Sequence, residues 1–219
     1  MFYQISGVGP IRKSAGFSLV ELMVVVGVLS LLAAILLPAI STAQGKAREV
    51  SCNSNLRQVG MAMSLYLQDN DGAYPYAVDV VDVHVIPFWA SYPDFQKDIP
   101  SLPQVQDVLL PYTNSRFVYR CPADTGFISP DFQMALMNAF PSSFQKFGSS
   151  YGYRTEIAAK KITESQIRKP AEINLFLDLA GQWHGTLYPL AQRYNVLFAD
   201  GHIKNLDRAQ INGLWANPL

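Results

Sequence analysis

The feature that most constrains this chain is a long uncharged stretch close to its amino terminus. From Leu22 to Ile40, 19 consecutive residues of the 219-residue sequence carry no charged side chain. A helix rises about 1.5 Å per residue, so a helix of this length nearly crosses a hydrocarbon core of roughly 30 Å. A helix in a soluble core rarely needs such a run. The sequence therefore predicts a membrane-spanning helix.

The charges that flank this stretch predict its orientation. Arg12 and Lys13 precede it, whereas Lys46, Arg48 and Glu49 follow it. The positive pair on the amino-terminal side is closer to the stretch and is not diluted by an acidic residue. Because positive charge near a span favours the cytoplasmic side, we expect a cytoplasmic amino terminus, with the rest of the chain outside.

A secretory signal peptide is the first alternative, because it also places basic residues before an apolar run. Two features oppose it. The run is long for a signal peptide, and no small-x-small cleavage pattern with a polar mature start follows it. Glu21 also lies inside the segment, where burying its carboxylate costs about 2.5 kcal/mol or more unless it finds a partner. That carboxylate needs an explanation.

The stretch "KSAGFSLVELMVVVGVLSLLAAILLPAIS", residues 13–41, resembles the prepilin signature of type IV pilins and type II secretion pseudopilins. The resemblance implies that residues 1–16 form a leader peptide, which a prepilin peptidase removes by cutting between Gly16 and Phe17. The same enzyme would methylate the new amino terminus of Phe17. Residues 17–40 would then form a helix that lies first in the bacterial inner membrane and later in a filament core.

The resemblance also assigns assembly roles to two residues. Glu21 becomes the fifth mature residue and pairs with the amino terminus of a neighbouring subunit, so that a buried ion pair sets the axial register. The alternative is that Glu21 merely reaches the membrane interface. Pro38 removes a helical hydrogen bond and permits a kink or local melting, or else it marks the exit from the membrane.

Residues 41–70 predict an amphipathic continuation of this helix. One face collects its apolar side chains at helical spacing, which requires a covering surface: Cys52, Leu56, Val59, Met63, Tyr66 and Leu67. The sequence "QDNDG" then ends the helix with turn-forming residues. A calcium loop is a weaker interpretation, because the ligand pattern of an EF-hand is incomplete. The sequence from residue 55 to residue 75 is similar to that of a large pseudopilin-like group of planctomycete and verrucomicrobial bacteria.

Residues 71–219 predict a globular domain, with a variable loop region at about 76–150. Prolines break that region, and its aromatic residues either pin the loop to the core or recognise a partner or a sugar. Strand-like runs are "RFVYRCP" at 116, "SSYGYRTEI" at 149, "EINLFLDL" at 172 and "YNVLFADGHIKNL" at 194. In the last run, Asp200 and Gly201 predict a hairpin turn. The expected fold is α+β and pilin-like: a long amino-terminal helix packed on a small antiparallel sheet.

One position departs from the planctomycete-type pattern. Members of that group often carry a histidine ten positions before the Asp-Gly pair, but here Leu190 occupies this position. The nearest upstream histidine is His184. Whatever the usual histidine contributes cannot be transferred to this chain.

The two cysteines, Cys52 and Cys121, lie in the part of the chain that we place outside the cytoplasm, where a disulfide is permitted. Such a bond would join the long helix to the strand expected before "CPAD". Two reduced, buried thiols are the alternative.

Candidate catalytic or metal-binding groups are few. Asp178, His184, Asp200 and His202 lie near the ends of late strands, so a membrane-tethered hydrolase requires these four side chains to converge. Zinc-protease, Walker and nucleophile-elbow patterns are absent from the sequence, and we expect neither a cofactor nor an enzyme.

The composition argues against a nucleic-acid-binding surface, because 17 basic side chains balance 17 acidic ones. The sequence thus predicts a structural subunit of a type IV pilus-like or type II secretion-like filament. Its expected partners are the prepilin peptidase, other pilin-like subunits and the inner-membrane assembly machinery. The alternative is a ligand-binding module, displayed on a filament or anchored to a membrane.

Overall fold

The computed structural model of the protein describes residues 18–128, 138–185, 191–215 and 219. Gly16, Phe17 and Leu190 therefore lie outside the described residues. The chain divides into two compact units between Ala43 and Gln44. Each unit is described by itself.

Helix α1, Leu19–Asp69, runs through this division. In the amino-terminal unit every described residue of α1 is exposed in the single chain. Within the part of the chain that the structure describes, α1 is the one helix that is long and apolar enough to cross a membrane. Pro38 lies inside it without ending it.

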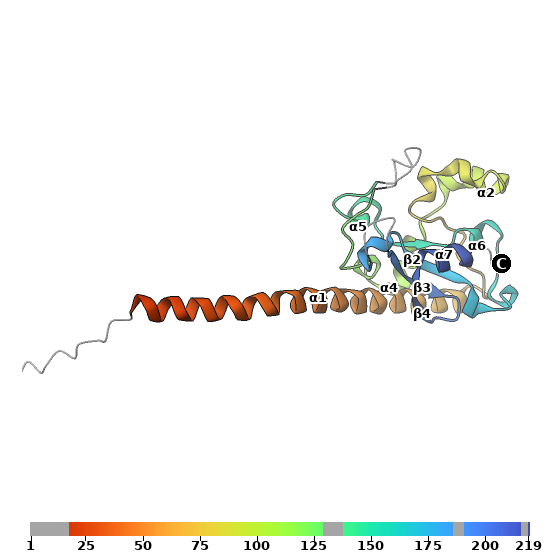
Figure 1. The fold of residues 1–219 in the computed structure, drawn as a ribbon. Helices are drawn as coiled ribbons and strands as arrows, with labels where there is room; N and C mark the ends of the chain where they lie inside the picture. Colours follow the sequence, from red (N-terminus) through yellow and green to blue (C-terminus); the bar gives the residue numbers. More distant parts are fainter. Residues whose placement is uncertain (1–17, 129–137, 186–190, 216–218) are drawn as a thin grey trace, which may run out of the picture. The chain divides into compact units, whose positions relative to one another are not determined.

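The second unit contains a four-stranded antiparallel sheet in the order β1-β2-β3-β4 (Figure 1). The strands are β1 Tyr151–Tyr153, β2 Asn174–Asp178, β3 Arg193–Phe198 and β4 Ile203–Asp207. Each strand pairs with the next one along the chain. Of the three connections, the one between β3 and β4 is a short turn, as antiparallel strands allow. A register irregularity in β2 lies between Asn174 and Phe176.

The later part of α1 packs against this sheet through one face. Gly60 lies so close to β3 that an added Cβ would be 3.1 Å from Leu197 Cδ1. Each large apolar side chain removed from water on this face contributes roughly 1.5–3 kcal/mol. The α+β prediction and the predicted helix face are confirmed, with Tyr66 half-buried and Ala62 added to the buried set: Cys52, Leu56, Val59, Ala62, Met63 and Leu67.

Helix α1 ends where the sequence predicted. Asp71 and Gly72 adopt φ angles of 52° and 74°, and the Gly72 N–H donates to the Leu67 carbonyl at 2.8 Å. This left-handed turn satisfies a carbonyl at the end of the helix, which is how Gly and Asp residues commonly terminate helices. The Asp69 carboxylate accepts a hydrogen bond from the Tyr112 hydroxyl at 3.0 Å.

Short helices make up most of the remaining described structure. Between α1 and β1 lie η1 Asp82–His84, η2 Ile86–Trp89, α2 Pro93–Asp98, η3 Ile99–Ser101, α3 Val105–Val108, α4 Leu110–Thr113, η4 Arg116–Tyr119 and α5 Ser143–Phe147. After β1 come α6 Glu156–Ala159, η6 Glu164–Gln166, η7 Pro170–Glu172, η8 Gly181–Trp183 and α7 Arg208–Leu214.

The strand predicted at "RFVYRCP" is wrong, because this segment forms η4. Ser115 Oγ accepts the Phe117 N–H at 3.2 Å, which caps the start of a tight turn. Val118 and Tyr119 are then both buried, while Phe117 is exposed. Two adjacent buried residues fit a helical turn but not the alternation of a half-buried strand.

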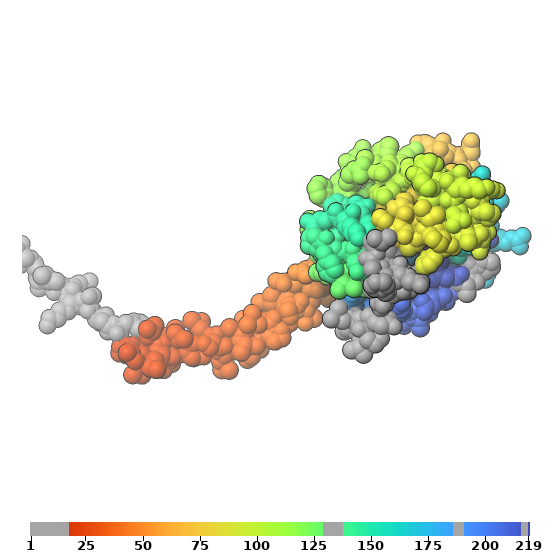
Figure 2. All heavy atoms as spheres, turned by 90° about the horizontal axis from the view of Figure 1, so that it is seen from above, coloured from red at the N-terminus to blue at the C-terminus, as the bar shows by residue number. Residues whose placement is uncertain are grey.

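The loop region is held to the core by some of its aromatic residues. Phe95 is buried, and the rings of Trp89 and Tyr76 meet it edge-on at centroid distances of 5.2 and 5.7 Å. Phe88, in contrast, is exposed. Figure 2 shows the yellow and green part of this region gathered on one face of the second unit, beside α5.

Candidate functional site

The exposed apolar surface of α1 is the first functional feature. From Leu19 to Ile40 its side chains are open to solvent in the single chain. Exposing apolar surface to water costs about 25 cal/mol per Å², and monomeric soluble proteins rarely carry so large a patch. This segment therefore needs lipid or other protein around it. Its large apolar members include Leu22, Met23, Val24, Leu29, Leu32, Ile35 and Leu37.

Glu21 lies at the start of this surface and closes a reciprocal pair with Ser18. Glu21 Oε2 accepts the Ser18 N–H at 2.8 Å, and Ser18 Oγ accepts the Glu21 N–H at 3.1 Å. This is a capping box, in which two otherwise unpaired N–H groups of the first turn are satisfied. The sequence "SLVE" carries its signature, and the interpretation of Glu21 by resemblance alone missed it.

Pro38 is accommodated within a continuous helix. Proline has no N–H, so the carbonyl four residues earlier loses its usual partner. The Pro38 carbonyl itself accepts the hydroxyls of Ser41 and Thr42, at 2.9 and 3.0 Å. The neighbouring hydroxyls thus bind backbone within the apolar stretch instead of remaining unpaired.

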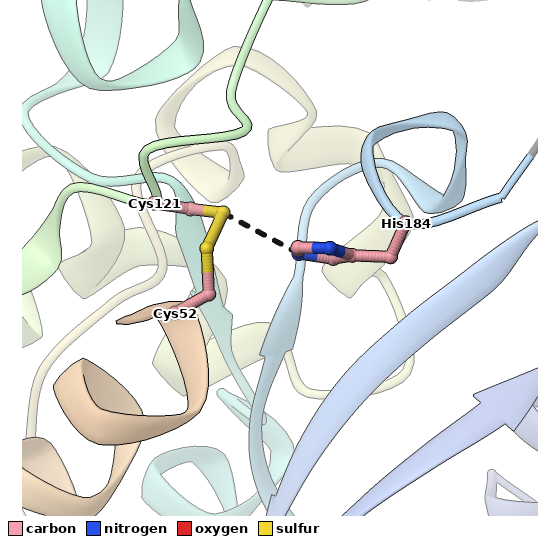
Figure 3. Close-up of side chains that lie close together, drawn as sticks. All are labelled: Cys52, Cys121 and His184. Atoms are coloured by element: carbon pink, nitrogen blue, oxygen red, sulfur yellow. Dashed lines mark hydrogen bonds between the residues drawn. A yellow bond between two sulfur atoms is a disulfide. The ribbon is translucent and has the colours of Figure 1, made fainter. Parts of the chain in front are cut away.

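Cys52 and Cys121 form a disulfide, with their sulfur atoms 2.07 Å apart. Both residues are buried in the main core cluster. Figure 3 shows the His184 ring directed at this bond, and His184 Nε2 lies 3.4 Å from Cys121 Sγ. The disulfide joins α1 to the segment that follows η4, across 69 residues of chain.

Asp178 completes this buried group from the end of β2. Its Oδ2 accepts the Asn195 N–H at 2.7 Å and lies 3.5 Å from His184 Nε2. Its Oδ1 is buried with no hydrogen-bond partner. Burial raises the pKa of Asp178 well above its usual value and lowers the pKa of His184. Both shifts favour the neutral forms, as desolvation does in general.

Asp200 and His202 form a separate pair at the β3–β4 turn. His202 Nδ1 lies 2.5 Å from Asp200 Oδ1, and its ring stacks on Phe198 at a centroid distance of 4.3 Å. Gly201 has a φ of 85°. Asp200 does not have a positive φ, although an Asp-Gly dipeptide readily supplies one in a hairpin turn. Burial raises the pKa of Asp200, but hydrogen bonds from the backbone and ring of His202 lower it below its usual value.

The two Asp–His pairs lie at opposite ends of β2. Asp178 bonds to Asn195, whereas Asn174, at the other end of the strand, pairs with Phe198 near the turn. Four residues of strand separate the ends by about 13 Å, at roughly 3.3 Å per residue. Within the described ranges, the convergence of Asp178, His184, Asp200 and His202 that a hydrolase requires is not observed.

A buried pair of acidic residues, Asp79 and Asp82, was missed by the sequence analysis. Asp79 accepts the N–H groups of Val81 and Tyr153 at 2.6 and 2.5 Å. Asp82 accepts the Thr155 hydroxyl and the Trp89 Nε1–H. Burial and the neighbouring carboxylate raise the pKa of Asp79, and burial raises that of Asp82. The sequence did carry a signal for this pair, namely two aspartates three residues apart among valines.

This acidic pair borders a pocket of about 530 Å³. The pocket combines aromatic and acidic residues from the loop region with residues from β1, β2 and the carboxyl end. Its lining includes Asp79, Asp82, Trp89, Tyr92, Glu156, Leu177, Tyr194 and Trp215.

Comparison with known proteins adds two findings. Residues 11–37 match the family described as the prokaryotic N-terminal methylation motif. The type II secretion system core protein G of Pseudomonas aeruginosa is 34% identical over 64 residues, which cover 29% of this chain and 44% of that protein. No solved structure shows a significant match to the chain. The motif and the similarity show that this chain resembles prepilin- and pseudopilin-like proteins over part of its length.

Proposed function

We propose that this protein is a structural subunit of a type IV pilus-like or type II secretion-like filament. The observation that carries the proposal is that the methylation motif, residues 11–37, overlaps the exposed apolar part of α1 from Leu19 onward. A helix with this surface requires surroundings that a membrane provides before assembly and neighbouring helices provide afterwards.

In this proposal, a prepilin peptidase cleaves between Gly16 and Phe17 and methylates Phe17. The matched motif includes both residues. The mature chain then comprises a core helix at 17–40, its amphipathic continuation at 41–70 and a periplasmic domain at 71–219. Arg12 and Lys13 favour a cytoplasmic amino terminus before cleavage.

Assembly uses Glu21 in a second way. In the single chain its carboxylate caps the first turn of α1 through Ser18. In the filament, we propose, the carboxylate turns to the Phe17 amino group of a neighbouring subunit. Two opposite charges in a packed, water-poor core would then define the axial register. The inner-membrane assembly machinery brings the subunits together.

The decisive experiment is intact-mass measurement and amino-terminal sequencing of the protein from its native membranes, without reduction. A chain that begins at N-methylated Phe17 is the expected result. A chain that still begins at Met1, in a cell with an active prepilin peptidase, would overturn the proposal.

A ligand-binding module is a second candidate, favoured by the aromatic and acidic pocket. Trp89 and Trp215 line it, and aromatic faces with a few polar groups are typical of small-ligand sites. Fluorescence titration of the full chain in detergent, with soluble oligosaccharides as the probe, tests this function. Trp89→Phe should abolish the response and Trp183→Phe, outside the pocket lining, should retain it. No response to any saccharide in the unmodified chain would contradict this candidate.

A further inference from the structure

The disulfide and His184 bring three metal-ligand atoms together in one buried place. One ligand atom each from Cys52, Cys121 and His184 lie within 4.8 Å of one another. Asp178 Oδ2 adds a fourth at 3.5 Å from His184 Nε2. Figure 3 shows the first three side chains, with the imidazole directed toward the sulfur atoms.

We propose that reduction of the Cys52–Cys121 disulfide converts this group into a binding site for one Zn²⁺ ion. The ligands are the two cysteine thiolates, His184 Nε2 and a carboxylate oxygen of Asp178. The site is therefore gated by redox state: closed when the sulfur atoms are bonded to each other and open when they are not.

Two of the existing distances match edges of a tetrahedral zinc site. With Zn–S near 2.3 Å and Zn–N or Zn–O near 2.1 Å, the N–S edge is about 3.6 Å and the N–O edge about 3.4 Å. The observed distances from His184 Nε2 are 3.4 Å to Cys121 Sγ and 3.5 Å to Asp178 Oδ2. Both edges thus exist before any metal binds.

The remaining adjustment is in the sulfur atoms. They are 2.07 Å apart in the disulfide, and a tetrahedral site needs about 3.8 Å between them. Breaking the covalent bond removes the constraint that holds them together, and rotation about each Cα–Cβ bond moves them apart.

Asp178 gives an independent reason to expect a cation here. It is fully buried, and its Oδ1 has no hydrogen-bond partner. An unpaired buried carboxylate oxygen is costly and calls for an explanation. A divalent cation beside the carboxylate would supply the missing partner. The Asn195 N–H, which donates to Oδ2, would orient this ligand as outer groups do in metal sites.

The chemistry balances with a dithiol as reductant. The dithiol transfers two electrons and two protons to the disulfide, giving two thiols and the oxidised dithiol. Zn²⁺ then displaces the two thiol protons into solvent and is held by two thiolates. The metal replaces the covalent bond as the link between α1 and the segment at Cys121, so the same two parts of the chain stay joined in both redox states.

Cobalt substitution tests the site in the full chain in detergent, after reduction with a phosphine. We expect thiolate-to-cobalt charge-transfer absorption that saturates at one Co²⁺ per chain and is removed by Zn²⁺. The unreduced protein should show none. Cys52→Ser and Cys121→Ser should each lose the absorption. His184→Ala should weaken binding by at least about tenfold, the loss that even an outer-shell partner causes. His202→Ala is the matched control and should bind normally.

Three results would overturn the proposal. The first is the absence of absorption in the reduced chain, whether far-ultraviolet circular dichroism shows that chain folded or not. The second is absorption that persists unchanged in urea, since unfolded thiols would then account for it. The third is equal Co²⁺ affinity in the unmodified chain and the His184→Ala variant.

Discussion

Ser18 and Glu21 bind each other through two hydrogen bonds: the Ser18 N–H donates to Glu21 Oε2 at 2.8 Å, and the Glu21 N–H donates to Ser18 Oγ at 3.1 Å. This relationship explains how a carboxylate is tolerated at the start of a membrane-length helix. One carboxylate oxygen accepts the Ser18 N–H, which would otherwise be unpaired, and negative charge is favourable at a helix amino terminus.

The Ser18→Ala substitution should loosen the first turn of α1. It removes the acceptor for the Glu21 N–H, and loss of a serine cap costs about 1 kcal/mol. We expect faster amide hydrogen exchange at Leu19–Met23 in detergent micelles. Ser30→Ala is the control, because the Ser30 hydroxyl donates to the Val26 carbonyl in mid-helix and caps nothing. Equal exchange in both variants would contradict a capping role.

The Glu21→Gln substitution should separate capping from assembly. Glutamine keeps an oxygen that accepts the Ser18 N–H, so the helix should begin normally. It lacks the charge that the proposed pairing with a neighbour's amino group requires. We expect normal membrane insertion but a loss of sedimentable filaments, measured by ultracentrifugation of sheared cell material. Filament yield equal to that of the unmodified chain would exclude the charge-pairing role.

Removal of the disulfide should destabilise the second unit strongly. The bond closes a loop with a sequence separation of 69 residues, and loop entropy for such a length corresponds to about 4 kcal/mol. A Cys52→Ala/Cys121→Ala double variant should therefore unfold at a much lower urea concentration, monitored by tryptophan fluorescence in detergent. An unchanged midpoint would show that the unfolded chain gains little freedom from the loss of the bond.

Some of this fold can be predicted from the sequence, because its signals are local. Helical spacing from Cys52 to Leu67 identifies the buried face of α1, and the Asp-Gly pair marks the β3–β4 turn. The error at Arg116–Tyr119 is equally local in origin. A β-rich composition there competes with the Ser115 cap, and the cap determines the structure.

The buried polar groups could not be predicted in the same way. Asp178 meets His184, and His184 meets the disulfide, only after the chain has brought α1, β2 and the segment at Cys121 together. Asp79 likewise meets Tyr153 across 74 residues. Such contacts depend on packing and on loop closure, and no short sequence pattern encodes either.

Two glycines of α1 should respond to substitution in opposite directions. An added side chain at Gly60 meets Leu197, so Gly60→Val should overpack the helix–sheet contact and cost roughly 1–3 kcal/mol. At Gly45 nothing lies within 4 Å of an added Cβ, so Gly45→Ala should stabilise by about 0.5–1 kcal/mol through lower unfolded-state freedom. Urea unfolding of both variants checks the pair. A neutral Gly60→Val would mean that α1 and β3 separate easily.

The buried Asp79–Asp82 pair should make stability fall as pH rises. Both carboxyls have a pKa raised above the unfolded value of about 3.9, so the folded chain binds more protons than the unfolded chain above that pH. Their contribution is fully present below the unfolded pKa and is lost as pH rises through the folded pKa.

The Asp82→Asn substitution tests this dependence, because it removes one of the two protons involved. We expect the free energy of unfolding to vary less steeply with pH above about 4, by up to about 1.4 kcal/mol per pH unit. Asp107→Asn is the control, since Asp107 forms a surface ion pair with Arg116 and lies in a solvent-exposed setting. Urea unfolding at a series of pH values gives the slopes. Equal slopes for Asp82→Asn, Asp107→Asn and the unmodified chain would contradict the prediction. The Asp79–Asp82 pair would then be ionised in the folded protein at no cost in free energy. Its burial beside Thr155 would in that case need a compensating positive group.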